Sequence, residues 1–174
     1  MPVPTEGNIW LQVYPKILWI VGQQCAGKTM LTTVLGSCGA KVLHIGEQLR
    51  KTRNAAEFLH SENPYAPYLV EDEVQKMISE AIYQFKRESG TLVIDSAPRN
   101  KLQLPLLAEV QEMSTVIFVM EEYEVRRARA RHKYGNDLTL FEKREAFEVE
   151  WIKEFVGMMV EHNIDHLVLG GRTE

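Results

Sequence analysis

A glycine-rich octapeptide that ends in lysine and threonine is the part of this chain best suited to chemistry. Residues 22–29 read GQQCAGKT and satisfy the pattern GxxxxGK[ST], whose backbone N–H groups surround phosphate oxygens. The glycines permit the curl, Lys28 reaches the β- and γ-phosphates, and the Thr29 hydroxyl reaches Mg²⁺. We therefore expect a nucleoside triphosphate site formed by Gly22, Gln23, Gln24, Cys25, Ala26, Gly27, Lys28, Thr29 and Met30.

The segments on either side of this phosphate loop have the character that the motif requires. Residues 17–21 form an apolar run of strand length, and residues 30–35 can open a helix. An ordinary glycine-rich turn would need neither the lysine nor the hydroxyl. A helix N-terminus lowers thiol pKa values, so Cys25 could be a redox switch, but a small residue tolerated beside glycine is the simpler interpretation.

A carboxylate stands at the end of another apolar run. Residues 91–95 read TLVID, so Asp95 ends this expected strand. Phosphate-loop enzymes use such a strand-end carboxylate to orient Mg²⁺ and its water ligands. Aspartates at strand ends also commonly cap turns, but the phosphate loop earlier in the chain favours the functional interpretation. Thr29 and Asp95 are our candidate Mg²⁺ residues.

The elements that must position these groups alternate along the chain. Apolar runs at 17–21, 41–45, 91–95, 115–120 and 166–169 predict five strands, with helical patterns between them at 46–60, 71–88 and 139–162. Such alternation predicts an α/β fold, a three-layer arrangement with a five-stranded parallel sheet and ligands at the carboxyl ends of the strands. The long interval from 46 to 90, broken by prolines at 64 and 67, must contain an insertion.

Length and composition limit the class of protein. The 174 residues, 45% of them hydrophobic, are sufficient for one domain spanning 1–174 with one core. A formal net charge of −4 gives no overall case for nucleic-acid or membrane-surface binding. Two cysteines form no disulfide framework, and neither a signal peptide nor a membrane span is recognisable, so we expect a cytoplasmic protein. The oligomeric state is open, with a monomer slightly favoured.

The residues after Asp95 resemble a known family. Asp95, Pro98, Arg99 and Gln103 match, in order, the Asp-Gly-Phe/Tyr-Pro-Arg segment and the following glutamine of adenylate-kinase-type nucleoside monophosphate kinases. Residues 44–50 resemble the family's Thr-Gly-Asp-x-Leu-Arg segment, with Gly46, Leu49 and Arg50 matching, and residues 68–74 resemble its Leu-Val-x-Asp-Glu stretch. The resemblance implies a monophosphate-binding insertion at 46–70, with Gly46, Arg50, Arg99 and Gln103 binding the nucleoside monophosphate.

The family's arginine-rich helix has a counterpart after the fourth strand. Arg127 and Arg131 are four residues apart, so they share one helix face and can both point at phosphate. Arg144 aligns with a further family arginine. The family's lid is reduced here to residues 132–138 and lacks an expected arginine, for which Lys133 is a possible substitute. The resemblance implies Lys28, Arg99, Arg127, Arg131 and Arg144 as catalytic residues.

The resemblance implies phosphoryl transfer from Mg-ATP to a nucleoside monophosphate, with AMP as the first expectation. An anionic acceptor needs no general base, and no motif resembles one. Gln103 is the expected reader of the acceptor base, although its amide could rotate to suit a base other than adenine. Asn100 is reminiscent of pyrimidine-type monophosphate kinases, so the base remains open.

Three other interpretations remain. A kinase of another small molecule would share the loop and sheet but would need a general base for a hydroxyl acceptor. A non-catalytic nucleotide-binding protein would fit the short lid and the two mismatches, Ser96 and Ala97, after Asp95. A GTP-binding switch is disfavoured because residues 100–103 only superficially resemble a guanine-reading motif. The basic run 126–133 lacks the interleaved aromatics of a nucleic-acid surface, so nucleic acid is not an expected partner.

Overall fold

Five parallel strands form the centre of the molecule. The computed structural model describes residues 16–51, 70–88 and 90–170. The strands are β1 (Lys16–Val21), β2 (Lys41–His44), β3 (Thr91–Asp95), β4 (Ser114–Met120) and β5 (His166–Gly170), and they form one sheet in the order β2-β3-β1-β4-β5. Every pairing is parallel, which confirms the predicted α/β sheet and the positions of its strands.

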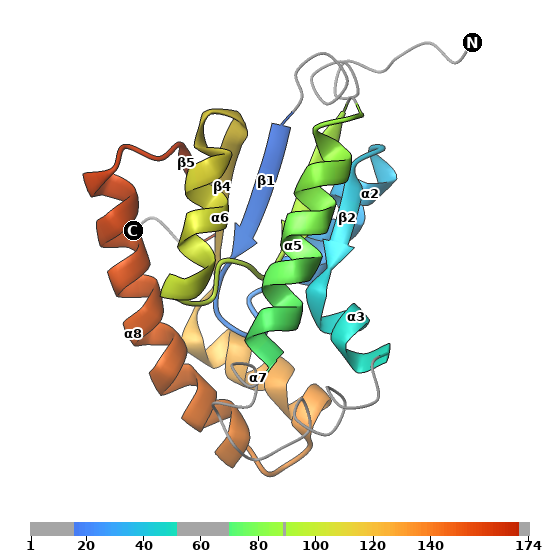
Figure 1. Cartoon of the computed structure of the whole chain (residues 1–174). Helices are drawn as coiled ribbons and strands as arrows, with labels where there is room; N and C mark the ends of the chain where they lie inside the picture. Colours follow the sequence, from blue (N-terminus) through green and yellow to red (C-terminus); the bar gives the residue numbers. More distant parts are fainter. Residues whose placement is uncertain (1–15, 52–69, 89, 171–174) are drawn as a thin grey trace.

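Helices cover both faces of this sheet. The described helices are α2 (Lys28–Ser37), α3 (Ile45–Lys51), α5 (Glu71–Phe85), α6 (Leu104–Glu109), α7 (Tyr123–Tyr134) and α8 (Thr139–Glu161), with short 3₁₀ turns η2 (Lys101–Gln103) and η3 (Gln111–Met113). Figure 1 shows α5, α6 and α8 in front of the sheet, with α2 behind it and α7 near the lower end. The predicted three-layer arrangement is confirmed.

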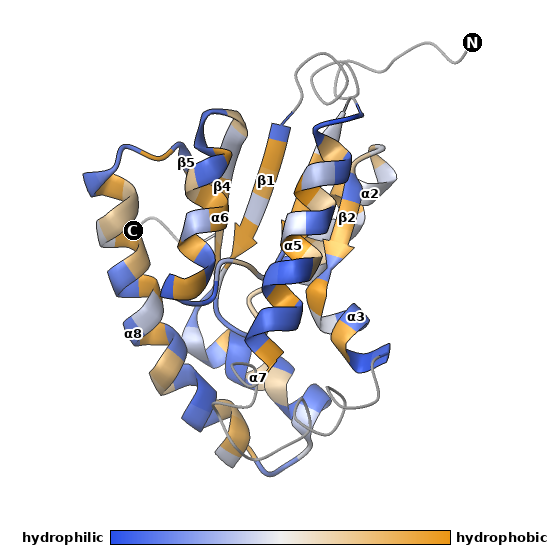
Figure 2. Ribbon diagram, viewed as in Figure 1, coloured by the Kyte–Doolittle hydropathy of each residue, from blue (hydrophilic) through white to orange (hydrophobic). Residues whose placement is uncertain are grey.

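The alternation of side chains along β1 explains the two layers. Ile17, Trp19 and Val21 belong to the large core under α5, α6 and α8, whereas Leu18 and Ile20 pack in a second cluster with α2. Successive side chains of a strand point to opposite faces, so a strand buried on both sides must be apolar throughout. In Figure 2, β1 is coloured as hydrophobic over most of its length, whereas α5 and α8 carry both hydrophobic and hydrophilic residues.

Each of the two long helices packs an apolar face against the body of the protein. On α5, Val74, Ile78, Ile82 and Phe85 are buried, and Met77 and Ala81 pack against them. On α8, Phe141, Phe155 and Met159 are fully buried in the cores, and Trp151 and Met158 pack beside them. None of the described helices is long and apolar enough to span a bilayer.

The sheet topology determines where a ligand can bind. The chain leaves β1 for β2 on one side, skipping the position of β3, and β4 and β5 are added on the other side. A parallel sheet binds ligands beyond the carboxyl ends of its strands at the point where the strand order reverses. That point lies at the end of β1, where the phosphate loop begins. Residues 52–69, most of the predicted insertion at 46–70, lie outside the described residues, as do residues 1–15.

Candidate active site

A cavity of about 710 Å³ lies at the carboxyl ends of the strands. It is bounded by the phosphate loop, the ends of β2 and β3, and parts of α3, α5, α7 and α8. Most residues predicted for the site line it: Gly22, Gln24, Cys25, Gly27, Lys28, Thr29, Gly46, Arg50, Asp95, Arg99, Gln103 and Arg144. One continuous cavity therefore brings together two groups of predicted residues, those of the triphosphate site and those of the monophosphate site.

The glycines of the phosphate loop are required by its geometry. A Cβ on Gly22 would overlap the carbonyl oxygen of Val119 in the neighbouring strand β4. Gly27 has φ 107° at the N-terminus of α2, and Cys25 has φ 62°, a value that favours glycine. Cys25 thus occupies a left-handed position that residues other than glycine rarely adopt. The loop passes directly into α2, as predicted.

Lys28 lies folded over the loop. Its Nζ donates hydrogen bonds to the carbonyl oxygens of Gly22 and Gln23, at 2.5 and 2.7 Å. Burial lowers the pKa of the Lys28 ammonium from its ordinary value of 10.5 to about 8, and the nearby Glu148 carboxylate partly opposes this shift. The Lys28 ammonium therefore lies beside the loop that would bind phosphate, and it loses its proton at a lower pH than an exposed lysine does.

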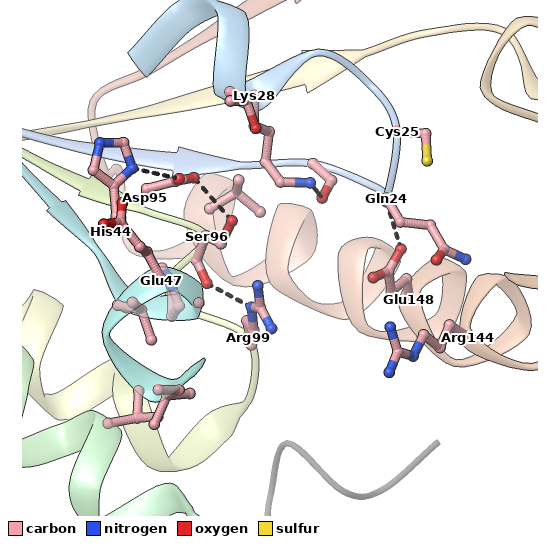
Figure 3. Close-up of a pocket in the computed structure, with 18 of the residues that line it drawn as sticks. Gln24, Cys25, Lys28, His44, Glu47, Asp95, Ser96, Arg99, Arg144 and Glu148 are labelled. Carbon is pink, nitrogen blue, oxygen red and sulfur yellow. Dashed lines mark hydrogen bonds and ion pairs between the residues drawn. The ribbon is translucent and has the colours of Figure 1, made fainter. Parts of the chain in front are cut away.

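Asp95 closes the cavity from the end of β3. Its Oδ1 accepts a hydrogen bond from the Ser96 hydroxyl at 2.9 Å, and its Oδ2 lies 3.3 Å from His44 Nδ1 at the end of β2 (Figure 3). Mg²⁺ in nucleotide sites is usually held by one or two protein oxygens together with phosphates and waters. The Thr29 hydroxyl and the Asp95 carboxylate, both lining the cavity, supply this kind of donor set. The residues present therefore fit a nucleotide-bound Mg²⁺.

The monophosphate side of the cavity carries two predicted arginines. Arg99 and Arg50 both line the cavity and are exposed, and Gly46 precedes Arg50 by one helical turn of α3. Arg99 Nε donates to the Ser96 carbonyl at 2.7 Å, which orients its guanidinium toward the cavity (Figure 3). These two cations line the same cavity as the phosphate loop, and their binding of an acceptor's phosphate stays a prediction.

Gln103 is held by its neighbours more tightly than the sequence indicates. Only 2% of the residue is exposed; its Oε1 accepts from Arg99 N at 2.8 Å, and its Nε2 donates to Glu71 Oε2 at 3.1 Å. If the amide rotated, its NH₂ group would face the backbone N–H of Arg99, and its oxygen would face the Glu71 carboxylate. Both contacts would be repulsive, so the orientation of the amide is determined. Asn100 Nδ2 donates to the same Glu71 oxygen at 2.7 Å. Base reading by Gln103 stays a prediction, and the freedom to rotate that the sequence permits is not available in this structure.

The arginine pair predicted on α7 is displaced by two residues. Arg127 and Arg131 do not line the cavity, whereas Arg129 and Lys133, also four residues apart, do. Arg129 Nη1 donates to the Cys25 carbonyl in the phosphate loop at 3.1 Å, and Nη2 donates to Glu121. Because two residues turn an α-helix by about 200°, the two pairs face opposite directions. Lys133 lines the cavity, and its role as a substitute for the missing lid arginine stays a prediction.

Two further predicted residues lie outside the cavity. Ala26 is buried in the second apolar cluster, and Met30 is 74% exposed on the outside of α2. Neither lines the cavity. The predicted lid at 132–138 is the last turn of α7 and a short connection to α8, in which Asp137 Oδ1 accepts a hydrogen bond from Thr139 N at 3.0 Å. That backbone hydrogen bond lowers the pKa of the Asp137 carboxyl.

Helix α8 contributes groups that the sequence did not single out. Glu148 lines the cavity, and its Oε2 accepts a hydrogen bond from the backbone N–H of Gln24 at 2.8 Å (Figure 3). Gln24 Oε1 accepts from the Tyr134 hydroxyl, which in turn accepts from Arg144 Nη1. No motif relates α8 to a loop more than 110 residues earlier, and only the i, i+4 spacing of Arg144 and Glu148 on one helix face hinted at a shared environment.

Comparisons with known proteins identify the fold. No protein-family model matches the sequence, and no curated protein matches it. Among solved structures, a chain from the PezAT chromosomal toxin–antitoxin system of Streptococcus pneumoniae superposes with a TM-score of 0.64 at 13% identity, covering 89% of this chain and 66% of that one. Deoxyadenosine kinase from M. mycoides with bound dATP gives 0.56 at 13%, covering 91% and 92%. The fold is that of the P-loop kinases.

A third structure widens the range of acceptors found on this fold. Shikimate kinase from Acinetobacter baumannii, in complex with shikimate, gives a TM-score of 0.55 at 12% identity, covering 96% of this chain and 89% of that one. The likeness covers nearly the whole of each kinase. It does not single out the adenylate-kinase type within the P-loop kinases.

Proposed function

We propose that this chain is a nucleoside monophosphate kinase, which transfers the γ-phosphate of Mg-ATP to a ribo- or deoxyribonucleoside monophosphate, with AMP as the first candidate. The observation that carries the proposal is the pairing of two cationic regions in one cavity. Lys28 and the phosphate loop lie on one side, and Arg50 and Arg99 lie on the other. A second phosphorylated substrate would explain the second region.

The charges of the cavity suit two polyphosphate or phosphate groups. Among the described residues that line it, six are lysine or arginine and four are aspartate or glutamate. Phosphoryl transfer depends on positioning and on stabilising negative charge that spreads over the moving group. Arg129, Lys133 and Arg144 come from α7 and α8 and can stabilise that charge between the two substrates.

Each residue has a definite part in this proposal. The phosphate loop and Lys28 bind the β- and γ-phosphates, and Thr29 and Asp95 hold Mg²⁺, which supplies charge neutralisation at the phosphates when bound. Arg50 and Arg99 bind the acceptor's α-phosphate. Because that acceptor is already an anionic oxygen, its attack requires no proton removal by the protein.

A hydroxyl acceptor is the second candidate, and one observation favours it. The His44 imidazole lies 3.3 Å from the Asp95 carboxylate at the cavity wall, an arrangement that can take a proton from a hydroxyl group. The similar structures include kinases named for deoxyadenosine and shikimate, whose names describe unphosphorylated acceptors. A protein that binds ATP but transfers nothing is the third outcome.

One acceptor panel separates these three functions. Ribo- and deoxyribonucleoside monophosphates, the corresponding nucleosides and shikimate are each incubated with Mg-ATP, and ADP formation is measured for each. Our proposal expects turnover with at least one monophosphate and none above background with nucleosides or shikimate. Turnover only with a nucleoside or shikimate would establish the hydroxyl kinase instead. ATP binding by calorimetry without turnover on any acceptor would establish the non-catalytic protein.

A further inference from the structure

Gln23, the second residue of the phosphate loop, points away from the cavity and toward α8. It does not line the cavity, and its Nε2 donates a hydrogen bond to Glu145 Oε1 at 2.7 Å. The residues in contact are 122 positions apart in the chain. A ligand that fills the cavity would therefore leave this contact in place, unlike contacts made inside the cavity.

A buried arginine holds the Glu145 carboxylate in position. Arg126 Nη1 and Nη2 donate to the two oxygens of Glu145, each at 2.6 Å, and the side chains are only 3% and 13% exposed. Arg126 Nε donates to the Glu121 carbonyl at 3.1 Å, and its guanidinium lies 5.8 Å from the ring of Tyr123. The guanidinium is thus restrained on three sides, and its two-pronged pairing leaves Glu145 Oε1 directed at the loop.

Stability alone does not explain why such a pair is buried. Removing two charges from water costs so much that apolar replacements of a buried ion pair are often neutral or stabilising. A buried pair can instead determine geometry, because its hydrogen bonds are directional and its partners are few. Here the geometry determined is that of the phosphate loop, whose Gln23 side chain donates a hydrogen bond to the pair.

We propose that Arg126 and Glu145 are positioning residues that hold the phosphate loop, through Gln23, in the conformation that binds the phosphates of a nucleoside triphosphate. The inference rests on the triphosphate binding of the proposed function, but not on the identity of the acceptor. Contacts from Lys28, Glu148 and Arg129 also restrain this loop at neighbouring positions. The relay from α7 through α8 adds a restraint at the Gln23 side chain, outside the cavity, before the ligand arrives.

The first test removes the loop end of the relay. In Gln23→Met the hydrogen bond to Glu145 is lost while the buried pair is retained. Binding of Mg-AMP-PNP and of inorganic tripolyphosphate is measured by calorimetry. A hydrogen bond to a charged group contributes enough that we expect about tenfold weaker binding of both anions. The melting temperature of the unliganded variant should stay close to that of the wild type.

The second test removes the pair itself without leaving a buried charge. The double variant Arg126→Met/Glu145→Met should fold, because both charges disappear together. We expect the same loss of affinity for both anions. Adding Gln23→Met to this double variant should weaken the binding of the two anions no further, because the three residues act as one chain of contacts. Glu150→Met makes the same glutamate-to-methionine change on the exposed side of α8, where the side chain is 81% exposed, and should bind like the wild type.

These measurements separate the inference from the proposed function. Wild-type affinity in Gln23→Met or in the double variant, for either anion, would overturn the positioning role. If both variants lose affinity and also melt at a clearly lower temperature than the wild type, the positioning role would be overturned as well, because the relay would then be only structural. If the variants behave as expected while no monophosphate accepts phosphate, the inference stands and the proposed acceptor is wrong. Failure of the wild type to bind either anion would overturn both.

Discussion

Glu148 on α8 places its Oε2 2.8 Å from the backbone nitrogen of Gln24 in the phosphate loop, and the N–H donates to it. The same carboxylate lies near Lys28 and raises the pKa of the Lys28 ammonium against the larger effect of burial. A negative group therefore stands beside the lysine that would bind phosphate. A bound triphosphate and this carboxylate would repel each other unless the Glu148 side chain moves.

The charge of Glu148 should oppose triphosphate binding. In Glu148→Gln the acceptor oxygen can remain while the negative charge is lost, so we expect about tenfold tighter binding of Mg-AMP-PNP. Calorimetry measures the affinity, and raised salt should narrow the difference between variant and wild type. If Glu148→Gln binds more weakly than the wild type, the carboxylate supports the loop rather than competing with phosphate.

The lowered pKa of Lys28 predicts proton uptake on binding. Burial lowers the pKa to about 8, and a bound phosphate anion favours the charged ammonium, so binding should draw a proton from solvent near pH 8. Calorimetry in two buffers of different ionisation enthalpy measures this uptake. It should vanish in Lys28→Met. Equal proton uptake in the variant would assign it to another group.

The same shift has a consequence for stability. Between the folded pKa of about 8 and the ordinary value of 10.5, the unfolded chain binds more protons at Lys28 than the folded protein does. The contribution of Lys28 to the free energy of unfolding therefore rises as pH increases through this window, and it is least favourable below pH 8. The difference in denaturant midpoint between wild type and Lys28→Met, followed across the window, measures this contribution.

Arg129 and Arg127 should differ sharply although they are two residues apart. Arg129 lines the cavity and contacts the Cys25 carbonyl, whereas Arg127 does not line it. We expect Arg129→Ala to lower kcat/KM by about 100-fold, the usual effect of removing one group that stabilises transition-state charge. Arg127→Ala should stay within about threefold of the wild type. If Arg127→Ala lowers kcat/KM more than Arg129→Ala does, the pair predicted from the sequence, Arg127 and Arg131, would be the functional one.

Much of the fold could be predicted from the sequence because its signals are local. The three central strands β1, β3 and β4 are apolar runs buried on both faces, and GQQCAGKT specifies a strand, a loop and a helix in order. The α7 pair was placed wrongly because two interleaved i, i+4 pairs satisfy the same spacing, and only packing decides which faces the loop. Ala130 and Arg126, both buried, are the residues that decide it.

The contacts of α8 could not be predicted for a different reason. Glu145 and Glu148 read as ordinary charges on a long amphipathic helix, and most such charges are solvated. Their partners, Gln23 and Gln24, precede them by more than 120 residues. Gln103 lines the cavity, but its fixed amide depends on Glu71, which no motif connects with it.

The two glycines Gly22 and Gly157 provide a paired test of the loop geometry. A Cβ at Gly22 would overlap a backbone oxygen of β4 that cannot easily move, so Gly22→Ala should destabilise the protein by about 1–3 kcal/mol. Gly157 lies within α8 with nothing within 4 Å of its Cβ position, so Gly157→Ala should stabilise by about 0.5–1 kcal/mol. Denaturant unfolding measures both. If the free energy of unfolding of Gly22→Ala equals that of the wild type, the phosphate loop can move away from β4 enough to accommodate the added methyl group.

The fate of the γ-phosphate tests the central claim most directly. Wild-type protein is incubated with Mg-ATP and the best acceptor of the panel, and phosphorus NMR follows the transferred group. We predict that it appears as the terminal phosphate of a nucleoside diphosphate, and that Lys28→Ala and Arg99→Ala each lower the rate by about 100-fold or more. Appearance of the group as a phosphate ester of a hydroxyl, or only as inorganic phosphate, would contradict the assignment.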